Sequence, residues 1–489
     1  MKLCSVPSIP AVFQGICRIT CYTALLNSAL APNIVLPSSP QYPDLVNKHY
    51  ATSAPLQLAC FFQPQSTEQV ALGVSILVES DDGSPQCQFA ICGGGHTPWK
   101  GAAGAEGGVT IDLALMNSTV YNPDTSSVAV MGGAKSGDVY KTLQPYGVAV
   151  TGGRSDAVGV GGFIIGGGLS YFGNKYGLAC DNVLNFEVVL SNGQAITANH
   201  TSYPDLFRAL KGGGNNLGIV TKVELRAFEQ GPLRGGLVGH SSADISQQNR
   251  ALVNLTSNLA RPARTGRHNL ELQRQVQDHG RSHRSPTHAR RRNSRHLPRL
   301  PRHPTDIQYP PNDRYLRPHD GDCAATGERA LCLTLTFEND VRVLEHLRTL
   351  HDESVEAATP RAESSDWDFI TFLQPFPSIL GDASKRKENV LGLDRMKGDY
   401  ILYLLLESPR DDALFHEIGY SLIKNLKDYS ERIGAGSDYI YMNCAGRDQN
   451  PLRGYGEENL QHLKAMARKY DSTGVFHTQC PGGWKVSDA

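Results

Sequence analysis

The sequence lacks the marks of several common protein classes. No apolar stretch approaches the roughly 20 residues that a helix needs to cross a bilayer, and the longest candidate, residues 400–406, is typical of a buried strand. The eleven cysteines contain no C-x-x-C pair, which argues against a structural zinc site. A Walker A sequence and a G-x-G-x-x-G turn opening a helix are also missing, which disfavours P-loop kinases and Rossmann dehydrogenases.

The net charge of −1 hides an uneven distribution. Residues 261–303 contain twelve Arg, six His, no Lys and two acidic residues, so this segment carries +10 and the remainder −11. Without aromatic residues, the segment buries too little apolar surface to offset its ordering entropy, and we expect no stable structure there. It fits a solvated loop, a nucleic-acid-binding arm, or a frame error or mispredicted intron. The abrupt return of apolar patterning near Arg329 favours the last interpretation.

With 489 residues the chain is too long for one ordinary core. Short strands alternate with Gly-rich turns over residues 56–228, and Asn192-Gly193 between apolar runs predicts a hairpin. Strands at 331–337 and 400–406 and helices at 341–350 and 413–433 follow, and this mixed order favours an α+β fold. The predicted parts are an N-terminal segment at 1–50, a domain at 51–230, a second domain at 231–436 that includes the Arg-rich segment, and a C-terminal segment at 437–489.

Three glycine clusters lie in the first domain. Gly93-Gly-Gly-His96 directly follows a predicted strand, the second cluster spans residues 159–168, and the third spans 212–218. Glycines let the backbone approach a ligand closely and point successive N–H groups at it, which suits a pyrophosphate. A single cluster is explained by tight turns, but three in one domain favour a cofactor site.

The sequence resembles the FAD-linked oxidases of the vanillyl-alcohol oxidase/PCMH fold, in the berberine-bridge-enzyme-like branch, and it is most similar to members from filamentous fungi. The resemblance covers nearly the whole chain apart from the Arg-rich segment. It implies a two-domain PCMH-type FAD-binding fold whose separate substrate domain is an antiparallel sheet covered by helices. The motifs that carry it are GGGHTPW (93–99), GGFIIGGGLSYF (161–172), YGLACDNV (176–183), LKGGGNNLGIVT (210–221), YMNCA (441–445) and YGEENLQHLKAMARKYD (455–471).

In that family the histidine of the GGGH loop is bonded covalently to FAD, which implies His96 here. Some members have a second tether, a cysteine in a C-P-T-V-G stretch, but the matching position is Ser155, so we expect attachment through His96 alone. The family usually has Arg before the loop, where this chain has Cys92, and Cys180 is expected to be a packed thiol. The resemblance assigns FAD binding to Gly93, Gly94, Gly95, His96, Thr97, Ser155, Val158, Gly159, Gly162, Gly166, Gly167, Asn182, Val220 and Asn443.

The implied reaction is hydride transfer to FAD from a substrate carbon bearing OH or NH, while a base removes the heteroatom proton. Tyr441, at the family's Y-x-N position, is the candidate base; with an ordinary pKa of about 10 it would need a cationic neighbour. The competing interpretation is a core tyrosine. Val158, where a larger Leu blocks oxygen in relatives, implies reoxidation by molecular oxygen and release of hydrogen peroxide.

The expected partners are a small-molecule substrate from secondary metabolism and oxygen, with no nucleic acid or membrane, and the protein is expected to be a monomer. A flavin dehydrogenase or cyclase that does not use oxygen, and a non-catalytic product with a disrupted substrate domain, are the alternatives. Sequons at Asn117, Asn199 and Asn254 permit secretion, which is favoured over a cytoplasmic location. Relatives often join an N-terminal helix to the first strand by a disulfide, which implies a Cys21–Cys60 pair in an oxidising compartment. The competing interpretation is two buried free thiols in a cytosolic enzyme.

Overall fold

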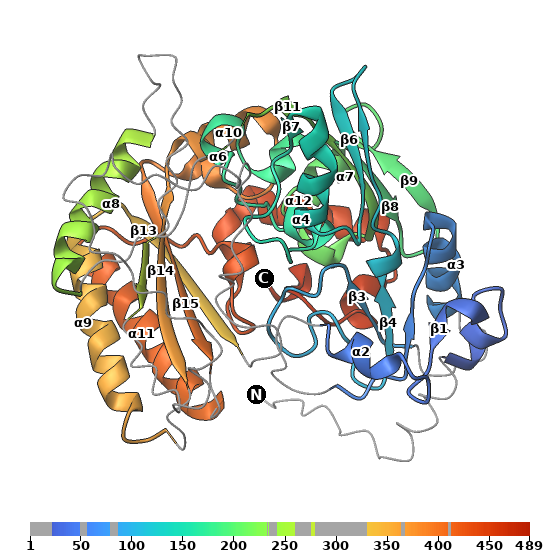
Figure 1. Ribbon diagram of the computed structural model, residues 1–489, viewed down its shortest axis with the longest axis horizontal. Coiled ribbons are helices and arrows are strands. Elements are labelled where there is room, and N and C mark those ends of the chain that lie inside the picture. Colours follow the sequence, from blue (N-terminus) through green and yellow to red (C-terminus); the bar gives the residue numbers. More distant parts are fainter. Residues whose placement is uncertain are drawn as a thin grey trace.

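The computed structural model describes residues 22–48, 56–78, 87–231, 233, 242–259, 275–278, 330–362, 367–408 and 412–489. The expectation that the Arg-rich segment has no stable structure falls outside the described residues except at Gln275–Asp278. These four residues form a strand that pairs with residues 370–373, so the expectation is wrong for them. In the described ranges, no helix combines the length and the apolar character needed to cross a membrane. Figure 1 shows two bodies side by side, with the chain's final segment between them.

The first body begins with a small mixed sheet in the order β1-β2-β4-β3. Its strands are β1 (Ile34–Val35), β2 (Cys60–Phe62), β4 (Val109–Asp112) and β3 (Phe89–Cys92), and β4 runs parallel to both of its neighbours. The helices α2 (Tyr42–Val46) and α3 (Thr67–Val78) accompany it, and Val70, Val74 and Leu77 of α3 join the sheet residues in one core. Because β3 and β4 are parallel, their C-terminal ends emerge together, and β3 leads directly into the GGGH loop.

A second sheet of the same body is antiparallel and has the order β5-β6-β10-β8-β9. Its strands are β5 (Thr119–Asn122), β6 (Ser127–Met131), β10 (Ile219–Arg226), β8 (Val183–Val189) and β9 (Ala195–Ala198), with a short β7 (Val148–Ala149) and β11 (Phe228–Glu229) pair beside it. The predicted hairpin is confirmed: β8 pairs with β9, and Gly193 has φ 76° in the turn. Helices α4 (Ser136–Leu143), α5 (Val160–Ile165), α6 (Gly173–Tyr176) and α7 (Pro204–Leu210) complete this body.

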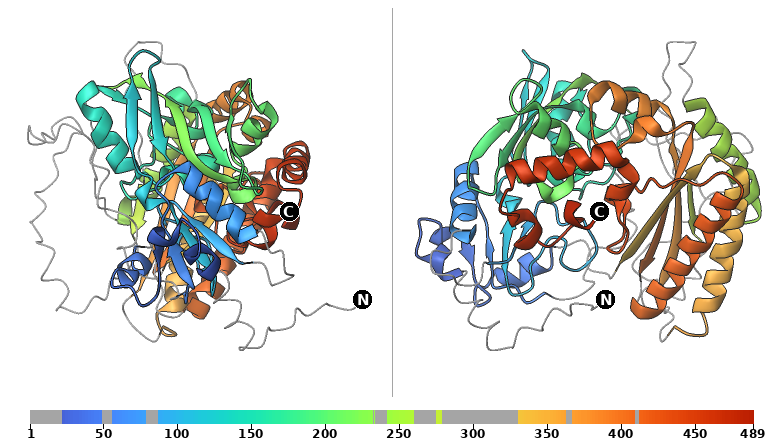
Figure 2. Two further views of the ribbon diagram at one scale, coloured as in Figure 1. Left: turned by 90° about the vertical axis from the view of Figure 1, so that its right-hand side faces the viewer. Right: turned by 180° about the vertical axis from the view of Figure 1, so that it is seen from behind.

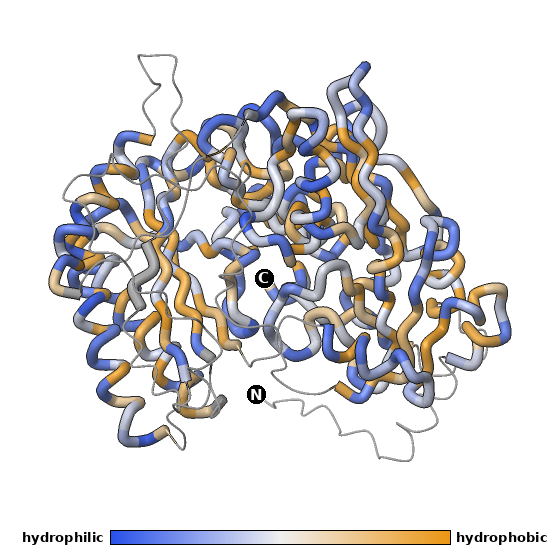
Figure 3. The backbone as a smooth tube through the Cα atoms, in the orientation of Figure 1, coloured by the Kyte–Doolittle hydropathy of each residue, from blue (hydrophilic) through white to orange (hydrophobic). Residues whose placement is uncertain are grey.

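The second body is the antiparallel sheet covered by helices that the resemblance implies. Its strand order is β12-β14-β15-β13, from β12 (Gln275–Asp278), β14 (Asp368–Phe376), β15 (Tyr400–Ser408) and β13 (Leu331–Glu338). One face packs on α8 (Ile245–Leu259), α9 (Val341–Ala358) and α11 (Asp412–Arg432), as Figures 1 and 2 show. Helix α10 (Ile379–Lys387) lies toward the first body. In Figure 3 the strands are mostly apolar, while the covering helices alternate polar and apolar positions, as amphipathic helices do.

The last segment packs on the first body. Helix α12 (Glu457–Tyr470) crosses α7, where Lys469 forms an ion pair with Asp205 at 2.6 Å and Arg208 donates to Asn459 at 2.8 Å. The helix α13 (Val475–Thr478) adds Val475 and Phe476 to the core of the small mixed sheet. The right view of Figure 2 shows this segment lying across the back of the first body.

Glu407 on β15 is a buried acid inside the helix-covered core of the second body. Its side chain is fully buried, and neither carboxylate oxygen has a hydrogen-bond partner among the described residues. Burial holds the pKa of Glu407 well above its ordinary value of 4.5. The folded protein therefore retains a proton that the unfolded chain releases, so the free energy of unfolding falls as the pH rises above about 4.5.

Replacing Glu407 with leucine is expected to raise the free energy of unfolding near neutral pH by about 1–3 kcal/mol, because it removes one unsatisfied buried polar group. The gain should shrink as the pH falls toward 4.5, where the acid is protonated in both states. Urea unfolding at several pH values measures this. The control is Glu338→Leu at the exposed end of β13, which should change little. A loss of stability in Glu407→Leu at neutral pH would contradict the assignment.

Candidate active site

Two of the predicted glycine loops meet backbone to backbone. A Cβ atom on Gly94 would lie under 3.0 Å from the Gly159 backbone, and one on Gly159 would lie under 3.0 Å from Gly94. Real Cβ atoms essentially never come that close, so only glycine fits at either place. The loop that carries His96 and the segment that carries Ser155 and Val158 are therefore parts of one site.

The loop after β6 holds these two segments together. Lys135 forms an isolated bridge with Gly159, and the Ser136 amide donates to the Val158 carbonyl at 2.9 Å. Gly132, which was not predicted as a site residue, has its carbonyl 3.3 Å from a Cβ built on Gly93 and 2.8 Å from one built on Gly161. The sequence signal for it was Gly132-Gly133 directly after a strand, the same pattern as the GGGH loop.

His96 lies in the loop that follows β3, and its Nε2 atom is buried. The loop continues through the exposed Thr97 to Trp99, whose ring packs edge-on against Trp484 with a centroid distance of 5.4 Å. The third predicted glycine cluster is bonded to that C-terminal tail. Asn216 donates to the Trp484 carbonyl at 2.9 Å, and Asn215 donates to the Gly482 carbonyl at 2.8 Å.

Ser155 and Val158 lie half-buried in the second segment. The Ser155 hydroxyl accepts the Ala157 amide at a long 3.4 Å, so it is only weakly held. Val158 packs closely on Gly153: a Cβ built on Gly153 would lie 3.0 Å from the Cβ of Val158. Gly162, one turn further, would place a Cβ with no heavy atom within 4 Å, so the backbone here borders open space. Val220 on β10 reaches the same group of loops, because its carbonyl lies against Gly132.

Tyr441 and Asn443 hold α5 and the segment that follows it. The hydroxyl of the buried Tyr441 accepts the Leu169 amide at 2.6 Å, and Asn443 donates to the Phe163 carbonyl at 2.9 Å and to the Tyr441 hydroxyl at 3.2 Å. Burial raises the pKa of Tyr441, and the charge of Arg154 lowers it by less. The lowered pKa that a base would need is therefore not found, and these contacts favour a positioning role for Tyr441.

The remaining predicted residues take other places. Gly166 lies so close to the Asn443 side chain that it has no room for a Cβ, and Gly167, with φ +103°, packs on Leu391. Asn182 donates to the carbonyls of Tyr176 and Leu178 and lines a separate cavity. We therefore place Asn182 apart from the glycine loops.

The cysteines give one confirmed prediction and one correction. Cys180 is a fully buried free thiol, as predicted. Cys60 is also a free, buried thiol, so the predicted Cys21–Cys60 disulfide is wrong, and Cys21 itself lies outside the described residues. Instead, Cys87 is disulfide-bonded. Cys60 lies on a strand in the core of the small mixed sheet. A free thiol packs there as a small apolar side chain and needs no disulfide.

Comparisons with known proteins agree with this geometry. The family described as "FAD binding domain" matches residues 58–199. An FAD-dependent monooxygenase, drtC of Aspergillus calidoustus, is 34% identical, with 96% of this chain and 90% of the relative covered. A second, sdcF of Emericella nidulans, is 33% identical, with coverage of 95% and 98%.

Solved structures share the fold at low identity. Xylooligosaccharide oxidase from Myceliophthora thermophila C1, in complex with xylobiose, superposes with a TM-score of 0.70 at 19% identity and covers 95% of this chain and 99% of its own. Glucooligosaccharide oxidase from Acremonium strictum gives a TM-score of 0.65 at 17% identity, with 93% and 97% covered. The chain therefore belongs to the FAD-linked oxidoreductases, as its fungal relatives do, and it is an FAD-dependent oxidoreductase with the vanillyl-alcohol oxidase/PCMH fold.

Proposed function

We propose that this enzyme is an oxidase: it oxidises an alcohol or amine carbon of a small molecule, its FAD is attached through His96 alone, and oxygen reoxidises the cofactor to release hydrogen peroxide. The observation that carries the proposal is the backbone contact between Gly94 and Gly159, which joins the His96 loop to the Ser155–Val158 segment. A pathway of secondary metabolism is inferred from the fungal relatives.

The residues present fit FAD. Where Gly94 meets Gly159 the backbone is bare of side chains, and at Gly162 it borders open space, as close approach to a pyrophosphate requires. His96 supplies a ring nitrogen within this group. The Acremonium oxidase is described as carrying a 6-S-cysteinyl, 8α-N1-histidyl FAD, which is a double attachment. Here Ser155 has no thiol at the position matched to the second tether, which supports a single attachment.

When bound, FAD takes up the hydride equivalent from the substrate carbon. The chain's own part is to bind and orient the substrate, and we assign that to the sheet face opposite α9 and α11. Thr336, Leu402 and Gln374 form one row across β13, β15 and β14. Gln374 is buried, and its Oε1 atom has no hydrogen-bond partner among the described residues. Such a row suits a mainly apolar molecule with a hydroxyl or amine that donates to Gln374.

This face is directed toward the first body. Phe376, next on the same face of β14, lies with its ring centroid 5.7 Å from that of Tyr439 and 6.4 Å from that of Tyr441. Since Tyr441 in turn holds the segment after α5, the substrate face and the glycine loops are linked through the C-terminal segment. The function of Tyr441 in this arrangement is to fix that segment, and its hydroxyl is already engaged as an acceptor.

The test does not need the natural substrate. The holoenzyme is reduced with dithionite, freed of excess reductant and mixed with oxygenated buffer, while flavin absorbance and peroxide are followed. An oxidase reoxidises rapidly with one peroxide per flavin. The alternative to an oxidase is a monooxygenase, as the relatives are described. Slow reoxidation of the flavin, or a peroxide yield far below one per flavin, would contradict an oxidase.

Val158→Leu is expected to slow this reoxidation, because a larger side chain narrows the space beside the glycine loops. The rate constant for reoxidation, measured against oxygen concentration, gives the effect. Val120→Leu is the matched control, because Val120 is 60% exposed on β5. Equal rates in Val158→Leu and the unaltered enzyme would remove Val158 from the proposed oxygen path.

A further inference from the structure

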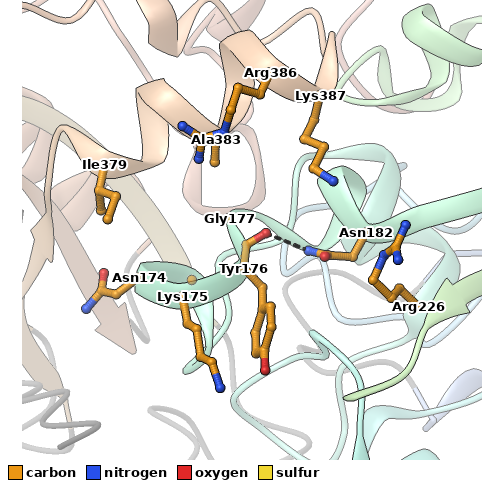
Figure 4. Close-up of a pocket in the computed structure, with 11 residues that line it drawn as sticks. Asn174, Lys175, Tyr176, Gly177, Asn182, Arg226, Ile379, Ala383, Arg386 and Lys387 are labelled. Atoms are coloured by element: carbon orange, nitrogen blue, oxygen red, sulfur yellow. Dashed lines mark hydrogen bonds between the residues drawn. The ribbon is translucent and has the colours of Figure 1, made fainter. Parts of the chain in front are cut away.

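A cavity lies between the two bodies, away from the glycine loops. It has a volume of about 390 Å³ and is lined on one side by α6 and its neighbours and on the other by α10 (Figure 4). This volume is within the range of small-molecule sites, roughly 300–1,000 Å³. None of the predicted residues of the glycine loops lines it, and Asn182 is the single predicted site residue that does.

The lining is rich in positive charge. Lys175, Arg226, Arg386 and Lys387 line the cavity, and no acidic side chain does so among the described residues. None of these four side chains forms an ion pair with a described carboxylate. Cations gathered without counter-charges repel one another, and an anionic ligand would relieve that repulsion.

Two of these cations converge on one polar group. Figure 4 shows Lys387 extending from α10 toward Asn182, with Arg226 beyond it, whereas Lys175 points away. Asn182 is buried, and both of its amide hydrogens are used, donating at 2.9 Å to the carbonyls of Tyr176 and Leu178. Its Oδ1 atom is left as an acceptor on the cavity wall.

Asp181 supplies only part of the missing counter-charge, because burial raises its pKa by more than the charges of Lys211 and Lys387 lower it. It lies behind Gly177 and does not line the cavity. Its oxygens already accept the Leu178 amide at 2.9 Å and the Asn389 side chain at 2.8 Å. The raised pKa of Asp181 disfavours its charged form. The positive charges of Lys387 and Arg226 are therefore left largely for a ligand to neutralise.

We propose that this cavity binds a small phosphorylated molecule that also carries a hydroxyl group. A phosphate monoester brings close to two negative charges in one group, which matches two converging cations better than a carboxylate does. Arginine offers a planar pair of donors to phosphate oxygens, and lysine adds a point charge. The hydroxyl donates to Asn182 Oδ1. Such a ligand touches α10 of one body and β10 of the other, and so links them independently of the flavin.

The experiment titrates the flavin-loaded enzyme at low ionic strength by calorimetry, with ribose 5-phosphate, inorganic phosphate, ribose and citrate as probes. Using the flavin-loaded enzyme keeps the probes out of the cofactor's own phosphate site. We expect saturable binding of ribose 5-phosphate, weaker binding of phosphate and none of ribose. Binding of citrate as tight as that of ribose 5-phosphate would overturn the assignment to a phosphate.

Lys387→Met keeps the length of the side chain and removes its charge, and it should weaken ribose 5-phosphate binding by about ten- to a hundredfold. The matched control is Lys385→Met, on the same helix and exposed but not lining the cavity, which should bind as the unaltered enzyme does. An equal loss of ribose 5-phosphate binding in both variants would mean that only the general surface charge attracts the ligand, which contradicts a site in the cavity. Absence of saturable binding in the unaltered enzyme would overturn the proposal outright.

Discussion

Replacing His96 with alanine is expected to turn a flavin that resists denaturation into one that denaturation extracts. A histidine–flavin bond survives acid precipitation, whereas a cofactor held only by backbone contacts leaves when the fold is lost. Because Ser155 stands where a second, cysteinyl tether would be, no other bond should retain the flavin. The expected change is thus nearly complete: a coloured protein pellet becomes colourless, and the flavin moves to the supernatant.

Absorbance of pellet and supernatant after acid precipitation measures the effect, and the intact mass should fall by one FAD. Ser155→Ala is the matched control, since Ser155 lies in the adjoining segment and its hydroxyl is only weakly held at 3.4 Å. That variant should keep its flavin in the pellet. Flavin that stays with the His96→Ala pellet would disprove the attachment, whatever the activity of the variant.

The sequence predicted the elements of the fold well wherever a single face is buried. The 413–433 helix, expected from its apolar period, is α11 (Asp412–Arg432). The helix expected at 341–350 continues to Ala358, because His351 and Ala358 are also buried in the second body. Such an extension depends on tertiary packing, which local periodicity does not report.

The site was less predictable, because its parts meet through the backbone. The glycine clusters predicted a cofactor site, but not that Gly94 would meet Gly159, or that Gly132 would lie against both loops. The cluster at 212–218 had the same composition, yet its asparagines bind the C-terminal tail. The role of Tyr441 could not be inferred either, since its partner Leu169 is 272 residues away in the sequence.

Replacing Gly159 with alanine is expected to cause the second large effect, loss of flavin incorporation together with a fall in stability. Gly159 has φ −70° and ψ 131°, a conformation that alanine adopts freely, so the substitution introduces no backbone strain. What it introduces is a methyl group under 3.0 Å from the amide and Cα of Gly94. Backbone cannot move aside as a flexible side chain would, and such overpacking costs about 1–3 kcal/mol.

The clash must push the His96 loop away from the Ser155–Val158 segment, and this is the reason that flavin should be lost as well as stability. Gly398→Ala is the control, because a Cβ there meets no atom within 4 Å and the glycine is far from the loops in sequence.

Gly162→Ala separates the loss of stability from the loss of flavin. Its Cβ also enters open space, so the fold should keep its stability while flavin uptake falls if the cofactor occupies that space. Flavin content per protein and the unfolding midpoint of each variant decide the matter. Full flavin loading in Gly159→Ala would show that the contact between the two loops does not form the cofactor site.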